Sequence, residues 1–257
     1  MKKTIISFNV TIGSYQSFID QIVNLIADAK SCYICVANVH MLIEAYRDQS
    51  FASIVNNAEL TTPDGMPLAL SMDLIHGIKQ DRVAGMDLLP DLLKESENKK
   101  FPVYFYGGTQ EMLDKTKDYL LLNYPSCPVA GLHSPPFRVL TETEDNEIIE
   151  VINKSGAKLL FVALGCPKQE KWMSKMQGRI HMPMIGIGGA LPVMVGIQKR
   201  APTWVQKASL EWLYRLVQEP KRLFRRYAVT NSLFLTLLLK TVLEKKLGKK
   251  ENSLHSV

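Results

Sequence analysis

The 257-residue sequence contains only four cysteines, at positions 32, 35, 127 and 166. This number is too small for a disulfide scaffold, and a chain of this length does not need one, so we expect a reducing compartment. The amino-terminal apolar run is broken by Asn9, Thr11 and Gly13 and is followed by no small-residue cleavage site, so we expect no signal peptide. The uncharged stretch 227–239 is shorter than the roughly 20 residues that cross a bilayer, and it predicts a helix lying on a surface.

Several ligand-binding motifs are also missing. The glycine-rich stretch 186–191 fails the dinucleotide fingerprint G-x-G-x-x-G because its last position is Leu191, and no Walker pattern occurs. This failure counts against a nucleotide-sugar dehydrogenase or epimerase. The histidines form no H-x-x-x-H pair, and Cys32 and Cys35 fall within a predicted strand, where their side chains face opposite ways. We therefore predict buried structural thiols and no metal site.

Positive charge is concentrated near the carboxyl terminus. Residues 199–250 carry thirteen Lys and Arg against three Glu, a net charge of +10, whereas the whole chain carries +6. A segment of this kind is expected to bind phosphate, in nucleic acid, in anionic lipid or in a diphosphate ligand. Its few aromatic residues recur at the spacing of a helix core, unlike a platform on which bases stack, and this spacing argues against nucleic acid.

Short apolar runs alternate with amphipathic stretches over most of the chain. Nearly all-apolar runs predict buried strands at 32–39, 102–108, 157–165 and 182–190. Ser14 and Thr109 are expected to cap helices. The repeated strand–loop–helix order predicts an α/β fold, a Rossmann-like doubly wound domain with a mainly parallel sheet. Its ligand should lie beyond the carboxyl ends of the strands, where the PDG, YGGT, GCPKQ and GIGG segments would gather.

The pattern changes after residue 195. We predict an α/β domain over 1–195, a basic, amphipathic, helical appendage over 196–247 and a disordered tail over 248–257. On one continuous helix, Arg215, Arg222 and Arg225 would share a face, because their separations are near multiples of 3.6 residues. Arginine binds phosphate through two N–H groups at once, although a solvated charged face is the simpler interpretation.

Three strand-end segments carry groups suited to chemistry, and each also has a simpler structural interpretation. Asp64, in the turn 63–65, is either a turn residue or a general base directed into the crevice. Gly188 and Gly189 form either a tight turn or a place where the backbone approaches a phosphate. Gln169, in the first turn of a helix, is either solvated or a ligand for a phosphate or a base.

Six segments, taken in order, resemble the WecG/TagA/CpsF family of bacterial glycosyltransferases, which is glycosyltransferase family 26. They are TPDGMPL at 62–68, RVAGMDL at 82–88, YFYGG at 104–108, FVALGCPKQEKWM at 161–173, GIGGAL at 186–191 and RAPTWVQKASLEWLYRLVQEPKRLFRRY at 200–227. The matching pieces cover nearly the whole chain, and the long terminal segment makes the resemblance specific.

The resemblance implies an inverting enzyme that transfers a hexosyl group from a UDP-sugar to a polyprenyl-diphosphate-linked sugar. The product would belong to teichoic acid or another cell-surface polysaccharide. The family is considered to need no metal or other cofactor, and no DxD metal motif occurs in this sequence. The resemblance also implies a cytoplasmic protein that binds the inner face of the cell membrane peripherally and does not bind nucleic acid. Homo-oligomerisation is left open.

The resemblance also implies roles for individual residues. It makes Asp64 the catalytic base. The substrate-binding residues that it implies are Asn38, Arg82 and Gln169. From their place at the ends of predicted strands, we also expect Gly107, Gly108, Gly188 and Gly189 to bind substrate. The appendage would close over the active site, with Arg215, Arg222 and Arg225 facing the diphosphate.

The sequence departs from the family at one point. Many members read T-x-N-A-E after the first long strand, whereas here Val36 replaces the Thr and His40 replaces the Glu. The donor therefore stays open among N-acetylmannosamine, its uronic acid and glucose. An alternative from another class is a non-catalytic nucleotide-binding module with a basic tail that binds lipid or RNA. Release of UDP from UDP-sugars in the presence of a lipid-linked acceptor distinguishes the two.

Overall fold

Six strands form one parallel sheet in the order β4-β3-β8-β7-β5-β6. The structure is a computed structural model that describes residues 1–207 and 210–254, without the side chains of 207, 222, 225, 226 and 248–254. The strands are β3 (Tyr33–Ala37), β4 (Leu60–Pro63), β5 (Val103–Gly107), β6 (Val129–His133), β7 (Leu159–Ala163) and β8 (Met184–Gly186). Two further strands, β1 (Lys2–Ile5) and β2 (Phe8–Thr11), form an antiparallel hairpin that we did not predict. The parallel sheet confirms the predicted Rossmann-like fold.

Helices connect the strands and cover the sheet. They are α1 (Tyr15–Ala27), α2 (Val39–Arg47), α3 (Gln49–Asn57), α4 (Met66–His76), α5 (Gly85–Lys99), α6 (Gln110–Asn123), α7 (Glu142–Lys154), α8 (Lys168–Met176), α9 (Ala190–Met194), α10 (Thr203–Lys207), α11 (Glu211–Gln218) and α12 (Pro220–Leu254). Ser14 accepts a hydrogen bond from the Ser17 N–H, and Thr109 accepts one from the Met112 N–H. Both predicted caps are therefore confirmed.

Alternation along the strands divides the core into two clusters, one on each face of the sheet. Tyr33 and Cys35 of β3 belong to the cluster with α2, α3, α4, α7 and α8, whereas Ile34 and Val36 belong to the cluster with α1, α5, α6 and α9. The sheet is therefore buried on both faces, as expected for a doubly wound fold. Cys32 and Cys35 are buried free thiols, as predicted.

The appendage consists of separate helices. Pro220 lacks a backbone N–H and disfavours helical geometry in the residue before it. Helical structure is therefore interrupted at Glu219, between α11 and α12. Arg215 therefore lies on α11, whereas Arg222 and Arg225 lie on α12. Our argument that these three arginines share one helical face is wrong for this reason.

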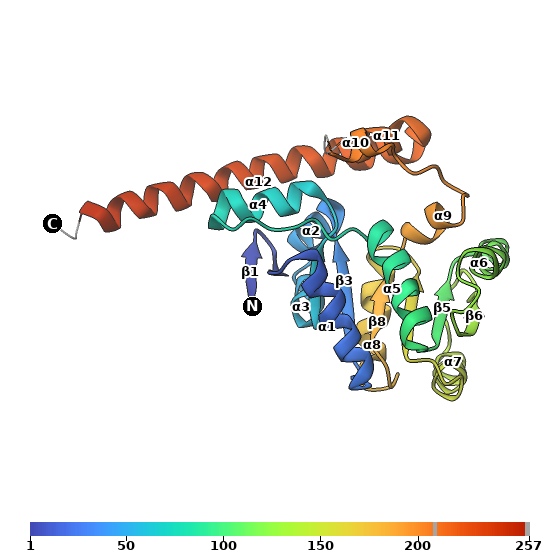
Figure 1. Cartoon of the computed structure of the whole chain (residues 1–257). Helices are drawn as coiled ribbons and strands as arrows, with labels where there is room; N and C mark the ends of the chain where they lie inside the picture. The colour runs from blue at the N-terminus through green and yellow to red at the C-terminus, as the bar shows by residue number, and fades with distance from the viewer. Residues whose placement is uncertain (208–209, 255–257) are drawn as a thin grey trace.

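Helix α12 packs against α2 and α4 through Thr230, Phe234 and Leu238. Figure 1 shows it lying along α4 and projecting past the body, while α9, α10 and α11 lie on the side to which the strands point. Within the described ranges, no helix combines the length and the apolar content needed to cross a bilayer. Helix α12 runs to Leu254, whereas 255–257 lie outside the described residues. The disorder predicted for 248–257 stays a prediction.

The two-sided core predicts a large cost for truncation in the central strands. Phe161 of β7 is fully buried, and its ring centroid lies 5.1 Å from that of Phe105. We expect Phe161→Ala to lower the free energy of unfolding by about 3–5 kcal/mol, measured by urea denaturation. The control Phe137→Ala, whose side chain is 87% exposed, should change it by less than about 0.5 kcal/mol. Equal effects of the two substitutions would contradict the described packing.

Candidate active site

Asp64 directly follows β4, at the edge of the sheet where the strands end. Its backbone N–H donates a hydrogen bond to the carbonyl oxygen of Ala37 in β3 at 2.8 Å. Its side-chain Oδ1 accepts a hydrogen bond from the backbone N–H of Gly85, the first residue of α5, at 2.9 Å. The carboxylate is therefore bonded outside its own turn, which a role in the turn alone does not explain.

Burial raises the pKa of Asp64 above the usual value for aspartate, and four groups oppose this effect. The Gly85 N–H, the positive charges of Arg82 and Arg215, and the Asn38 side chain each stabilise the ionised carboxylate. The structure thus brings Asp64 together with three other residues that we had selected from the sequence.

Asn38 connects the end of β3 to the start of α2. Its Oδ1 accepts a hydrogen bond from the Met41 N–H at 3.2 Å and so caps α2. Because this oxygen accepts the Met41 N–H, the amide NH₂ group of Asn38 is free to face Asp64 and donates the hydrogen bond to its carboxylate. The capping bond therefore sets the orientation of Asn38 toward the carboxylate.

Arg82 precedes α5, and only 14% of its side chain is exposed. Its Nε donates to the backbone carbonyl oxygen of Asp64 at 3.0 Å. Its Nη2 lies 3.4 Å from Asp87 Oδ2 and 3.2 Å from Glu211 Oε1. Asp87 also pairs with Arg200. Glu211 and Arg200 belong to the predicted appendage, so two ion pairs join the appendage to the segment beside Asp64.

Glu211 was not among our predicted site residues. Burial raises its pKa, the charges of Asp64 and Asp87 raise it further, and Arg82 and Arg200 oppose these effects. Glu211 lies in the segment 200–227 that carried the family resemblance, but it is 129 residues from its partner Arg82. No spacing rule could have paired the two residues.

The GIGG segment forms the turn between β8 and α9. Gly188 has a φ of +40°, in the left-handed region that favours glycine. The Nη2 of Arg215 donates to the Gly189 carbonyl oxygen at 3.5 Å, and a Cβ atom added at Gly189 would lie 3.0 Å from that nitrogen. Helix α9 has only five residues, so its dipole is small. The glycines here permit a close approach of Arg215 to the backbone.

Gln169 lies beneath this turn, with 4% of its surface exposed, so it is not solvated. Its Oε1 accepts a hydrogen bond from the Gly165 N–H at 3.2 Å, and its Nε2 donates to Glu170 Oε1 at 2.7 Å. Glu170 is fully buried, and burial raises its pKa. Other parts of the protein therefore engage both polar ends of the Gln169 side chain.

Gly107 and Gly108 end β5 at the same edge of the sheet. They have φ values of +111° and +81°, and a Cβ atom at Gly107 would lie 2.7 Å from the Ala163 backbone. Close packing of β5 on β7 thus already requires a glycine at 107. Since β7 separates β5 from β8, a strand spacing of about 4.8 Å places this pair roughly 10 Å from the GIGG turn.

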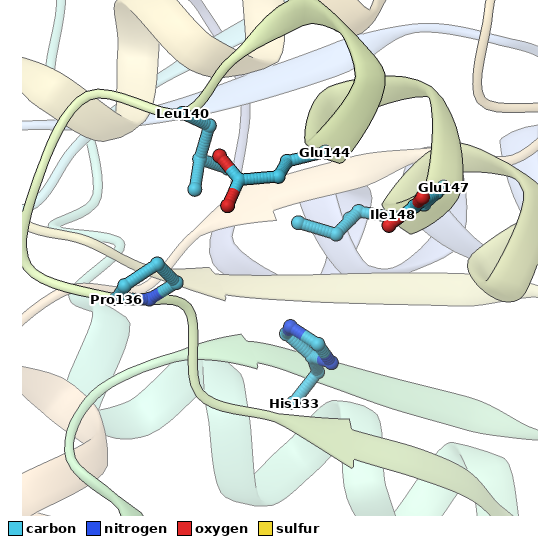
Figure 2. A pocket seen from close by; sticks show the side chains of 6 residues that line it. All are labelled: His133, Pro136, Leu140, Glu144, Glu147 and Ile148. Atoms are coloured by element: carbon cyan, nitrogen blue, oxygen red, sulfur yellow. The ribbon is translucent and has the colours of Figure 1, made fainter.

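A hollow of about 170 Å³ lies at the end of β6. Figure 2 shows its wall, made by His133, Pro136, Leu140, Glu144, Glu147 and Ile148. Because β6 and β4 are the two edge strands, the strand spacing puts this hollow roughly 24 Å from Asp64. It is also smaller than the 300 Å³ or so of a typical ligand pocket. The hollow is therefore separate from the Asp64 site.

The departures from the family pattern lie close to this site. Val36 is in β3, and a Cβ atom at Gly85 would lie 3.5 Å from its Cγ1, so Val36 packs against the residue that donates to Asp64. His40, in the first turn of α2, lies with its Nδ1 3.9 Å from Glu44 Oε1. The side chains of Arg222 and Arg225 are outside the described part of the chain, and their role stays a prediction.

The arrangement combines a group that can accept a proton with cations that can bind an anion. The Asp64 carboxylate is the acceptor, and the guanidinium groups of Arg82 and Arg215 supply positive charge. Among the described residues, no group of three or more His, Cys, Asp or Glu side chains is placed to hold a metal ion. The chemistry that fits the site is removal of a proton next to a bound anion.

Comparison with known proteins places this site in context. Residues 3–248 match the family model described as the glycosyl transferase WecG/TagA/CpsF family. An N-acetylglucosaminyldiphosphoundecaprenol N-acetyl-beta-D-mannosaminyltransferase of Bacillus spizizenii is 30% identical over 212 residues, which cover 82% of this chain and 80% of the relative. Proteins of the same name from Bacillus subtilis and Staphylococcus aureus are 29% and 28% identical, over 83% and 75% of this chain and 84% and 74% of the relatives.

The raised pKa of Asp64 predicts a cost to stability at neutral pH. Because the folded-state pKa lies above the unfolded-state value, the folded protein binds the proton more tightly, so stability falls as the pH rises through these values. We expect Asp64→Asn, which keeps an acceptor for the Gly85 N–H, to melt at a higher temperature than the wild type at pH 7. The difference should shrink toward pH 4. A variant that melts well below the wild type at pH 7 would contradict the assigned direction.

Proposed function

This chain belongs to the WecG/TagA/CpsF family of glycosyl transferases, and from that premise we propose the reaction that it catalyses. It transfers a hexosyl group from a UDP-sugar to a polyprenyl-diphosphate-linked sugar, with inversion at C1, in the synthesis of teichoic acid or another cell-surface polysaccharide. The names of the relatives support N-acetylmannosamine as the transferred sugar and N-acetylglucosaminyldiphosphoundecaprenol as the acceptor. Because the sequence departs from the family pattern at Val36 and His40, the uronic acid of N-acetylmannosamine and glucose stay open as alternative donor sugars.

The observation that carries this proposal is the fixed position of the Asp64 carboxylate. It lies where parallel strands end, bonded to Gly85 and beside Arg82 and Arg215. Ligands of doubly wound folds bind at this edge of the sheet. A base held there can reach a sugar hydroxyl while the arginines face the anionic donor.

In the proposed step the acceptor hydroxyl attacks C1 of the donor sugar. As the new C–O bond forms, the hydroxyl proton passes to Asp64 and the bond between C1 and the UDP oxygen breaks. Negative charge then grows on the diphosphate and requires fixed positive groups. Arg215 would provide one at the GIGG turn, and we propose that Arg222 and Arg225 provide two more. We propose that the reaction needs no metal ion.

We propose that α12 rests on the cytoplasmic face of the membrane, where the lipid part of the acceptor remains. Leu235, Leu239 and Leu243 recur every fourth residue and are 56%, 64% and 58% exposed. Lys240 and Lys246 are also exposed along this helix. Each basic group near an anionic leaflet contributes about 1 kcal/mol, so the exposed leucines and lysines together support reversible peripheral binding.

The proposed base predicts a loss of turnover in Asp64→Asn. Because general base catalysis contributes about 10²- to 10⁴-fold, kcat should fall at least about 100-fold. Release of UDP from UDP-N-acetylmannosamine, with a short-chain polyprenyl-diphosphate N-acetylglucosamine as acceptor, measures this effect. The control Asp20→Asn, at an exposed position of α1, should remain fully active.

Two outcomes would count against this proposal. Near-normal turnover of Asp64→Asn would remove Asp64 from the mechanism. A wild-type protein that binds UDP but releases none from any UDP-sugar and lipid-linked acceptor would instead support the non-catalytic nucleotide-binding module.

The proposed membrane surface predicts weaker lipid binding when its leucines become charged. We expect Leu235→Glu/Leu239→Glu to reduce binding to vesicles of 30% anionic phospholipid at least about tenfold, because each buried leucine is worth about 1.5–3 kcal/mol. Co-sedimentation measures this loss. The control Leu121→Glu/Leu122→Glu changes two exposed leucines of α6 and should bind as the wild type does. Equal losses in the two variants would place the lipid contact elsewhere.

A further inference from the structure

Glu170 is a fully buried carboxyl group that the proposed mechanism does not use. Its Oε1 accepts the hydrogen bond from Gln169 Nε2 at 2.7 Å. Its Oε2 is buried and has no hydrogen-bond partner among the described residues. An ionised carboxylate with one unpaired oxygen would be costly in such a place, so the neutral acid fits it better. The Cys166 thiol also interacts with this carboxyl group, and the contact with Gln169 is the one that connects Glu170 to the strand ends.

Gln169 connects Glu170 to the ends of two neighbouring strands. Its Oε1 accepts the Gly165 N–H just after β7. Its amide also fills the space under the end of β8, because a Cβ atom at Gly186 would lie 2.7 Å from Nε2 and one at Gly188 would lie 3.2 Å from Oε1. The orientation of this amide therefore supports both turns.

The supported GIGG turn lies close against Gly85, the residue that holds the proposed base. A Cβ atom added at Gly85 would lie 3.4 Å from the Ala190 Cβ and 3.8 Å from the Ile187 carbonyl oxygen. The N–H of the same Gly85 donates to Asp64 Oδ1 at 2.9 Å. A continuous series of contacts thus runs from Glu170 through Gln169 and the turn to the Asp64 carboxylate.

We propose that Glu170 is a positioning residue for the transfer reaction. By accepting the Gln169 N–H it fixes the GIGG turn, and through the contact of that turn with Gly85 it fixes the Asp64 carboxylate. The inference rests on the proposed function and deepens it. It also gives Gln169, which the family resemblance assigned to the substrate, a supporting role inside the protein.

Two substitutions at Glu170 separate this role from proton transfer. Glu170→Gln keeps a carbonyl acceptor for Gln169, and its kcat should stay within about threefold of the wild type. Glu170→Met has a similar volume but weak acceptor capacity, and its kcat should fall at least about tenfold. The acidic limb of its pH–kcat profile should also move to higher pH, because the Gly85 N–H that this series of contacts positions stabilises the ionised Asp64 carboxylate. The full-length protein is assayed with UDP-N-acetylmannosamine and the short-chain acceptor.

A matched control tests whether lost stability alone produces these effects. Ser96 is fully buried near the amino end of β5, away from the strand ends that carry the site. Its hydroxyl donates to the Phe101 carbonyl oxygen at 2.6 Å. Ser96→Ala should lower the melting temperature without changing kcat or the pH profile. If Glu170→Met does not fold, Gly186→Ala replaces it, because the added Cβ displaces the Gln169 amide while Glu170 stays. Gly186→Ala should show the same loss of kcat and the same shift.

The outcomes distinguish the inference from the function on which it rests. Wild-type kcat and an unshifted profile in a folded Glu170→Met or Gly186→Ala variant would overturn the positioning role. A Glu170→Gln variant as impaired as Glu170→Met would overturn it too, because the acceptor contact alone would then not suffice. Failure of the wild type to release UDP would overturn the proposed function instead.

Discussion

The hydrogen bond from the Gly85 N–H to Asp64 Oδ1 joins the turn after β4 to the start of α5. The absence of a side chain at Gly85 lets its backbone lie against both Val36 and the turn after β8. Three strand ends therefore meet around one carboxylate, whose direction is set by the Gly85 backbone and by the capped side chain of Asn38. A group fixed in this way loses little conformational freedom when a substrate binds beside it.

The electrostatics of the site follow from a balance around Asp64. Burial favours the neutral acid, whereas the arginines at 82 and 215 and the donors at 38 and 85 favour the ionised form. A proton acceptor at neutral pH must be ionised and yet remain basic, and opposing influences of this kind satisfy both needs. Glu211 takes part in the balance, because it pairs with Arg82 and adds negative charge near Asp64.

The fold and the residues nearest the proposed base could be predicted because their signals are local. Nearly all-apolar runs identified β3, β5, β7 and β8, and the family resemblance identified Asn38, Asp64 and Arg82. The partners Gly85, Glu170 and Glu211 were missed because they meet their neighbours only after the chain has folded. The shared face of the arginines failed for a local reason, since Pro220 ends the helical phase on which that argument depended.

The way in which the appendage docks suggests why it is placed over the strand ends. Helix α12 packs against α2 and α4, and these are the helices that begin at Asn38 and just after Asp64. Through the break at Glu219, the same packing positions α11, which carries both Glu211 and Arg215. If α12 rests on lipid, as we propose, the packing of this one helix determines both the position of the membrane surface and the positions of the charges around Asp64. Movement of α12 away from α2 and α4 would then alter the charge next to Asp64 as well as the contact with the membrane.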